Sequence, residues 1–181
     1  GEALIRKGDY SAAIKQLQTS LYLFPNSAPV HDLLGRSYEL QGNEAAAISE
    51  YKKSFLIKPE YLPPYLRLAD VYKNRGDEEI AISELRNALS VNPNFYEAKS
   101  KIAEASLNIG KTEQAIKYYN DLLNVPNYKI AAIKGLSKAY FEKAKQLNNQ
   151  TSITSEADYL DLERNIEQAI QNDPDNIELY L

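Results

Sequence analysis

Apolar residues recur along the chain at the three- and four-residue spacing of amphipathic helices. Two neighbouring segments illustrate the pattern, the first with Leu33, Leu34, Tyr38 and Leu40, and the second with Ala47, Ile48, Tyr51 and Phe55. This spacing gives each segment one apolar face along a helix. The pattern therefore predicts a chain built from pairs of amphipathic helices.

The breaks between these segments have a fixed period. Four glycines are spaced 34 residues apart, and three prolines keep the same step, with Pro126 one residue early: Gly8, Gly42, Gly76 and Gly110, then Pro25, Pro59 and Pro93. Glycine tolerates the left-handed backbone that ends a helix, whereas proline stops a helix. Each 34-residue unit is therefore predicted to hold two helices, with Asn43 and Asp77 as caps of second helices.

The residues between the breaks resemble the tetratricopeptide repeat, whose pattern is Trp-x2-Leu-Gly-x2-Tyr, then Ala-x3-Phe, then Pro. The second unit matches most closely, with His31 in place of Trp, followed by Leu34, Gly35, Tyr38, Ala47, Tyr51 and Pro59. The resemblance implies a right-handed superhelical α-α solenoid of helix-turn-helix repeats, in which stacked neighbours bury a continuous core.

The period divides residues 1–181 into a single repeat array. The expected repeats are a partial first repeat 1–27, then 28–61, 62–95, 96–129, a fifth repeat 130–176, and the start of a sixth at 177–181. The fifth repeat carries about 13 extra residues at its turn, around Leu147 to Ser155. Because this insertion is polar, we expect a mobile loop after a first helix extended to about Leu147. The first repeat lacks part of its first helix, so the chain reads as a piece of a longer protein.

Composition narrows the classes of partner. The net charge is −4, from 21 basic and 25 acidic residues, so no summed positive field favours nucleic acid. No apolar run approaches the length of a membrane-spanning helix, so this segment is not expected to insert into a membrane. The chain has no cysteine, and that count leaves a cytoplasmic and a periplasmic location both open.

No catalytic, cofactor-binding or metal-binding set is found in the sequence, and we expect a protein that is not an enzyme. The seven glycines form neither a dinucleotide nor a phosphate-binding loop. His31 is the only histidine and falls in a helix-packing position. Six of the fourteen tyrosines also fall in packing positions of the repeat, so we interpret them as core residues.

The resemblance also implies that the first helix of each repeat lines a concave groove. Residues 34 apart then form rows, one of which reads Leu33, Arg67, Lys101 and Gly135. The charged residues predicted to contact a peptide are Asp32, Arg36, Arg67, Asp70, Lys101, Glu104, Lys134 and Lys138. Alternating charges orient an extended chain through charge-assisted hydrogen bonds, yet the same residues could pair with one another.

The resemblance therefore implies a protein-protein interaction scaffold that holds a peptide or protein segment in this groove. Two alternatives remain at this stage. The repeats could recruit substrates or partners for a larger enzyme or for a secretion or assembly machine, or they could self-associate through the open ends of the repeat stack. The identity of the partner is left open, because one fold hosts many functions.

Overall fold

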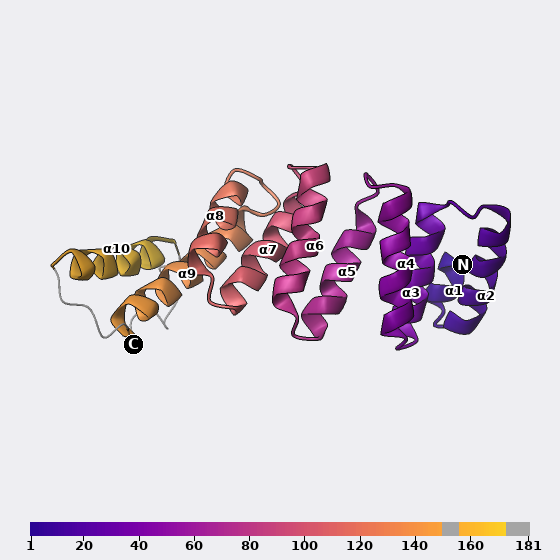
Figure 1. Ribbon diagram of the computed structural model, residues 1–181. Helices are drawn as coiled ribbons and strands as arrows, with labels where there is room; N and C mark the ends of the chain where they lie inside the picture. The colour runs from indigo at the N-terminus through magenta and orange to yellow at the C-terminus, as the bar shows by residue number, and fades with distance from the viewer. Residues whose placement is uncertain (150–155, 173–181) are drawn as a thin grey trace. The chain divides into compact units, whose positions relative to one another are not determined.

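The computed structural model describes residues 1–149 and 156–172, and these residues form helices joined by turns, with no strand among them (Figure 1). The helices are α1 (Glu2–Arg6), α2 (Tyr10–Leu23), α3 (Ala28–Leu40), α4 (Glu44–Ile57), α5 (Pro63–Asn74), α6 (Glu78–Val91), α7 (Tyr96–Asn108), α8 (Thr112–Leu122), α9 (Lys129–Asn149) and α10 (Glu156–Asn172). The predicted all-α solenoid of helix-turn-helix repeats is confirmed.

The chain forms two compact units, Gly1–Asn94 and Phe95–Leu181. In the first unit each helix packs on the next one along the chain, and α3 also packs on α5. In the second unit α7, α8, α9 and α10 follow the same rule, and α7 packs on α9. First helices of successive repeats are therefore neighbours within each unit. The repeat boundaries given above remain predictions.

The turns form as the period predicts. Gly8, Gly42, Gly76 and Gly110 all have positive φ, between 73° and 84°, each just after the first helix of its pair. A residue with a Cβ would be strained in this conformation, which explains the glycine at every repeat. The second helices α2, α4 and α6 end two residues before their prolines.

The two predicted helix caps differ. Asn43 accepts a hydrogen bond from the backbone N–H of Ala46 through Oδ1, as an N-cap should. Asp77 occupies the same position before α6 but its side chain makes no capping hydrogen bond. Its carboxylate instead lies 3.3 Å from Nε of Arg75. The expectation of a capping bond at Asp77 is wrong, because a neighbouring guanidinium competes for the same oxygen atoms.

Tyrosine side chains fill the core beside small residues. Of the six tyrosines interpreted as core residues, four are buried and two are half-buried: Tyr51, Tyr65, Tyr72 and Tyr119, then Tyr38 and Tyr140. In the second unit the ring of Tyr119 packs with Ala103, Ala115 and Leu136. Alanines at such positions let two helix backbones approach closely around a large ring.

Gly135 shows how close this approach is. A Cβ at Gly135 would lie 2.2 Å from Cζ of the Tyr119 ring, far inside van der Waals contact. Gly135 therefore faces α8 and the core, and its expected place in the groove row with Leu33, Arg67 and Lys101 is wrong. Leu136, the next residue, is buried like Ile102 34 residues earlier, so α9 keeps the register of the repeat, and Gly135 leaves the groove because the Tyr119 ring covers it.

Helix α9 is longer than the other first helices, which confirms the predicted extension, and it ends at Asn149. Its added turns pack on the preceding repeat. Gln146 donates a hydrogen bond to the carbonyl of Gly110 and accepts one from the Thr112 hydroxyl. Lys143 Nζ lies 2.8 Å from a carboxylate oxygen of Glu113. The predicted loop at 150–155 and the start of a sixth repeat lie outside the described residues.

The buried phenol of Tyr119 predicts a loss of stability at alkaline pH. Burial, with a contribution from the Glu104 charge, raises the pKa of Tyr119 to about 12. Since the folded pKa lies above the ordinary value near 10, the stabilisation is fully present below pH ~10 and is lost as the pH rises toward 12. We expect the wild-type chain to lose roughly 1–2 kcal/mol more than Tyr119→Phe across this window, as measured by urea unfolding. Equal losses in both proteins would contradict this assignment.

Candidate functional site

In the first unit, helices α3 and α5 bring the predicted groove charges of two repeats together. Arg67 of α5 approaches Asp32 of α3, with Nε 3.5 Å from Oδ1. The hydroxyl of Tyr61 donates a hydrogen bond to the other carboxylate oxygen at 3.2 Å. Asp32 is only 1% exposed, whereas Arg67 is half-buried. Two of the predicted site residues therefore pair with each other across the repeats.

Burial has the largest effect on the pKa of the carboxyl in this pair. Desolvation raises the pKa of the Asp32 carboxyl, while Arg67, the Tyr61 hydroxyl and Arg36 act in the opposite direction. Arg36 follows Asp32 by one helical turn and is half-buried, as is Asp70 on α5. In the first unit the buried carboxylate of Asp32 therefore lies behind the half-buried guanidinium of Arg67.

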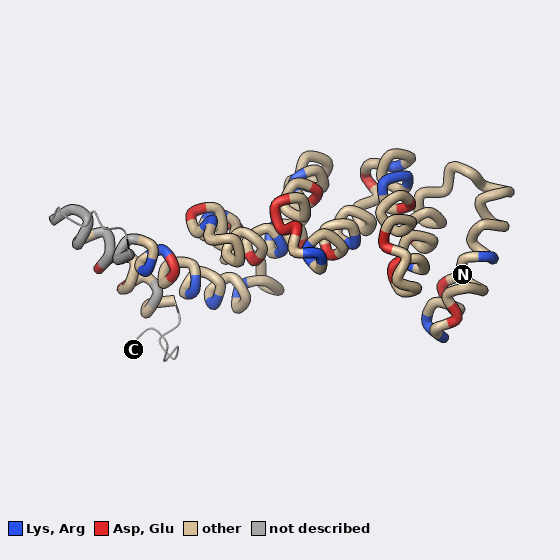
Figure 2. The backbone as a smooth tube through the Cα atoms, turned by 60° about the horizontal axis from the view of Figure 1, so that its bottom comes forward, with Lys and Arg blue, Asp and Glu red and all other residues tan. Residues whose placement is uncertain are grey.

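In the second unit, the predicted residues are more exposed. Lys101 on α7 is half-buried, whereas Glu104 on α7 and both Lys134 and Lys138 on α9 are exposed. Lys134 and Lys138 are one turn apart and thus share a face of α9. Helix α9 carries five lysines against a single carboxylate, Glu142, and its basic positions recur along the tube in Figure 2.

Similar hollows occur between first helices in both units. In the first unit, a hollow of about 380 Å³ lies among the end of α3, the Gly42 turn and α5. In the second unit, a hollow of about 430 Å³ lies among the end of α7, the Gly110 turn and α9. Lys138 lines the second hollow together with Phe141 and Leu107. Lys138 therefore lies on a helix rich in lysine and borders a hollow with a mixed polar and apolar lining.

His31 is held in the core by two acceptors. Its Nδ1 lies 2.6 Å from a carboxylate oxygen of Glu50, and its Nε2 lies 3.2 Å from the carbonyl oxygen of Pro25. The second carboxylate oxygen of Glu50 accepts from Lys53 at 2.7 Å. These contacts tie α3 to α4 and to the turn before α3. They support the structural interpretation of this histidine.

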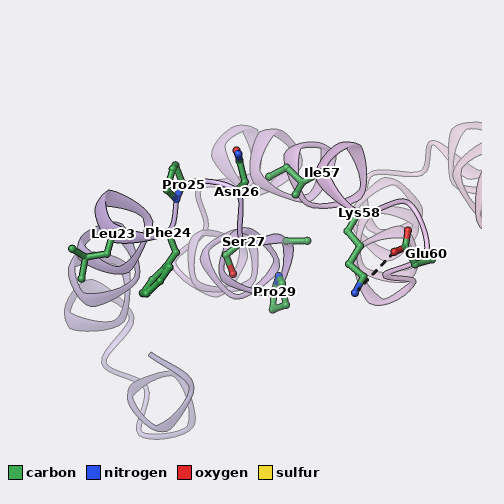
Figure 3. Close-up of a pocket in the computed structure, with 10 residues that line it drawn as sticks. Leu23, Phe24, Pro25, Asn26, Ser27, Pro29, Ile57, Lys58 and Glu60 are labelled. Carbon is green, nitrogen blue, oxygen red and sulfur yellow. Dashed lines mark ion pairs between the residues drawn. The ribbon is translucent and has the colours of Figure 1, made fainter.

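Another hollow in the first unit was not predicted. It has a volume of about 710 Å³ and lies between the turn before α3 and the turn after α4 (Figure 3). Leu23 and Phe24 stand at one end and Lys58 and Glu60 at the other, with Ser27 and the remaining lining residues between them: Pro25, Asn26, Ala28, Pro29 and Ile57.

A comparison of the repeats could have found this surface. Phe24 occupies a position that is Lys58 in the next repeat and Asn92 in the one after, whereas Tyr22 corresponds to Leu56 and then to Ser90. The side chains of Tyr22 and Phe24 are 88% and 68% exposed. The signal for this surface is an aromatic residue at a position where other repeats have a polar one. This position lies outside the groove-facing rows from which the binding residues were predicted.

The described residues contain neither a metal-ligand cluster nor a helix fit for a bilayer. Within 1–149 and 156–172, no group of three His, Cys, Asp or Glu side chains is arranged to hold a metal ion. In the same ranges, no helix is both long and apolar enough to span a membrane.

Known proteins share this architecture. The sequence profile of the tetratricopeptide repeat matches residues 1–55 and 66–129. A crystal structure of MamA protein superposes with a TM-score of 0.70 at 20% identity, covering 100% of this chain and 92% of that chain. YrrB, described as a TPR protein with an unusual peptide-binding site, gives 0.66 at 17% identity, covering 99% and 86%. PilF from Pseudomonas aeruginosa gives 0.66 at 16% identity, covering 99% and 76%.

No curated protein sequence matches the chain. At these identities the solved structures establish the fold alone, whereas the family profile covers well over half of the chain. The profile, the 34-residue period and the packed helix pairs agree, and the chain therefore belongs to the tetratricopeptide-repeat family.

Proposed function

We propose that this chain is a non-catalytic scaffold that binds an extended peptide or protein segment along its first helices. The general role of a protein-interaction scaffold follows from the fold, and one protein of similar structure, YrrB, is described as having a peptide-binding site. The observation that carries the proposal is the hollow at Lys138, where an apolar wall and a basic helix face meet.

The physical argument rests on the chemistry of that hollow. Leu107 and Phe141 offer apolar surface for one side chain of a bound segment. Lys134 and Lys138 are exposed, and neither makes an ion pair within the part of the chain that the structure describes. Glu142, a carboxylate that also lines the hollow, pairs with Lys145. Charge-assisted contacts beside an apolar anchor are a common mode of peptide recognition.

The charged residues of the first unit are suited to a different role in peptide binding. Arg67 already pairs with Asp32. A carboxylate of the ligand therefore gains less binding free energy at Arg67 than at a lysine that has no ion-pair partner. The Arg67 guanidinium, backed by a buried carboxylate, is pre-organised to donate to peptide carbonyls instead. We therefore assign charge selection to Lys134 and Lys138 of the second unit, and treat main-chain contacts of Arg67 as a property of the first unit by itself.

Reversing the two lysines is expected to abolish most of the peptide affinity. Peptides are first selected on the immobilised chain from a displayed random library, and their dissociation constants are measured by fluorescence anisotropy. Lys134→Glu combined with Lys138→Glu should weaken the selected peptides at least ~10-fold, since two attractions become two repulsions. Both positions are exposed, so the thermal midpoint should stay within about 2 °C.

Lys117→Glu provides the matched control, because Lys117 is an exposed lysine on the second helix α8. Its reversal should leave affinity unchanged apart from a small general effect of net charge. If Lys117→Glu weakens binding as much as the double variant does, recognition is non-specific. If neither variant has an effect, peptides bind at a surface other than this groove.

A further inference from the structure

Helix α9 of the second unit carries a stripe of side chains that is apolar at both ends and basic in the middle. Ile130 is 73% exposed, Lys134 and Lys138 are exposed, and Phe141 lines the hollow at the end of α7. At about 100° per residue, these four side chains fall within about 80° of the helix circumference. The stripe therefore runs along one face of α9, from an apolar side chain over two lysines to the hollow.

The spacing along this stripe matches that of an extended peptide. Ile130, Lys134 and Lys138 follow one another at intervals of four residues, as does Glu142 in the lining of the hollow. Each interval is about 6 Å along the helix axis. In an extended chain every second side chain points the same way, and two residues span about 6.6–6.8 Å. The flexible lysine side chains absorb the small difference.

We propose that the ligand of this groove is an extended segment with the pattern apolar-x-acidic-x-acidic-x-apolar, lying along α9. The inference rests on the peptide-binding function proposed above and specifies the class of peptide. The two carboxylates of the segment pair with Lys134 and Lys138, one apolar side chain covers Ile130, and the other enters the hollow. Charge complementarity selects the acids, because neither lysine has an ion-pair partner among residues 1–149 and 156–172.

The lining of the hollow explains why the position after the two acids is apolar. Leu107 and Phe141 supply apolar surface, and the Lys145 ammonium lies 4.4 Å from the centre of the Phe141 ring. Glu142 also lines the hollow, where it pairs with Lys145. A third carboxylate of the ligand would meet this like charge. The hollow therefore accepts an apolar side chain and disfavours an acidic one.

The packing of α7 on α9 favours an extended segment over a helix. A helix with acids four residues apart would present its carboxylates at the same interval of about 6 Å. Such a helix is about 10–12 Å wide with its side chains. Helices α7 and α9, however, contact each other and leave a hollow of about 430 Å³ at their ends. This volume is at the lower end of the range for small-ligand sites and receives side chains only.

Three terminally blocked peptides of identical composition test the spacing, with affinities for the whole chain measured by fluorescence anisotropy. Leu-Ser-Glu-Ser-Glu-Ser-Leu has the proposed pattern, and Leu-Ser-Glu-Glu-Ser-Ser-Leu brings the acids together. Leu-Glu-Ser-Ser-Ser-Glu-Leu separates the acids by four positions, the spacing that a bound helix needs. The first peptide should bind at least ~5-fold more tightly than either of the others, since it alone places each acid opposite a lysine. The blocked ends exclude recognition of a free terminal carboxylate.

Charge exchange assigns each acid to its lysine. Lys134→Glu and Lys138→Glu should each weaken the first peptide at least ~5-fold. Replacing one glutamate of the peptide with lysine should restore binding to one variant, and replacing the other glutamate should restore binding to the other variant. Each acid faces a single ammonium group, so the two restorations should not be interchangeable. The assignment also gives the direction in which the segment runs along α9.

Ile130→Ser tests the apolar end of the stripe. It should weaken the first peptide at least ~3-fold, because the exposed contact surface is lost. Ile80→Ser is the matched control, since Ile80 is 44% exposed on the second helix α6 of the first unit. The control should leave the affinity unchanged. Equal losses in the two variants would exclude Ile130 as a contact.

Other results would overturn the inference and leave the proposed function intact. If reversal of Lys134 and Lys138 weakens library-selected peptides but the three defined peptides bind equally or not at all, the groove recognises charge without this spacing. Tightest binding of the third peptide would indicate a helical ligand. Restoration of both variants by the same exchanged peptide would exclude one-to-one pairing. Selected peptides that are insensitive to both reversals would instead contradict the proposed function itself.

Discussion

Replacing Gly135 with alanine is expected to destabilise the second unit by about 2 kcal/mol, although alanine is the better helix former. The added Cβ would lie 2.2 Å from the Tyr119 ring, which is buried between α8 and α9 and packs with Leu136. Either the ring or α9 must move, and the packing of both is then lost. Urea unfolding followed by far-ultraviolet circular dichroism measures this change.

The control for this prediction is the same substitution in a Tyr119→Leu background. Without the ring, Gly135→Ala should become neutral or should stabilise by up to about 1 kcal/mol, since only the gain in helix propensity remains. The difference between the two backgrounds is the coupling energy of the steric contact. An equal loss in both backgrounds would mean that Gly135 is needed for a reason other than the tyrosine.

Replacing His31 with phenylalanine is expected to cost about 2–3 kcal/mol in the first unit. The ring volume is largely kept, but Glu50 loses its 2.6 Å contact with Nδ1 and the carbonyl of Pro25 loses its 3.2 Å contact with Nε2. The Glu50 carboxylate keeps its ion pair with Lys53. Because Glu50 is only 8% exposed, water cannot fully replace the lost contact with the His31 ring. Thermal and urea unfolding of the variant measure the loss.

Two further variants identify the cause. Glu50→Leu added to His31→Phe replaces the whole pair by apolar groups and should recover most of the lost stability, because no buried charge is then left without its ring partner. Lys53→Ala removes the exposed member of the cluster and should cost less than about 1 kcal/mol. A double variant no more stable than His31→Phe would contradict the account.

Local structure and the repeat architecture could be predicted from the sequence, because each depends on near neighbours along the chain. The positive φ at Gly8, Gly42, Gly76 and Gly110 was predictable, since only glycine adopts it without strain. The ends of α2, α4 and α6 followed from their prolines. The extension of α9 could be read from helical periodicity that continues past the normal repeat length.

The candidate site was only partly predictable. The eight charged residues were identified by their 34-residue rows, and the structure brings together Asp32 and Arg67 in the first unit and Lys134 and Lys138 on one face of α9. Their contact with a peptide stays a prediction. The hollow at Lys138 was not predicted, because its wall depends on Phe141, which lies outside the rows that were followed.

Spacing along the chain was enough to establish the period, the helix pairs, the turns and the family, because these follow from periodicity and backbone chemistry over fewer than 40 residues. Whether each side chain in a predicted row is exposed to a ligand, by contrast, depended on how the helices pack. Asp32 is covered by Tyr61, 29 residues away, and Gly135 faces the ring of Tyr119. Such contacts depend on how neighbouring elements pack, because a large side chain from one element can cover a groove position on the next.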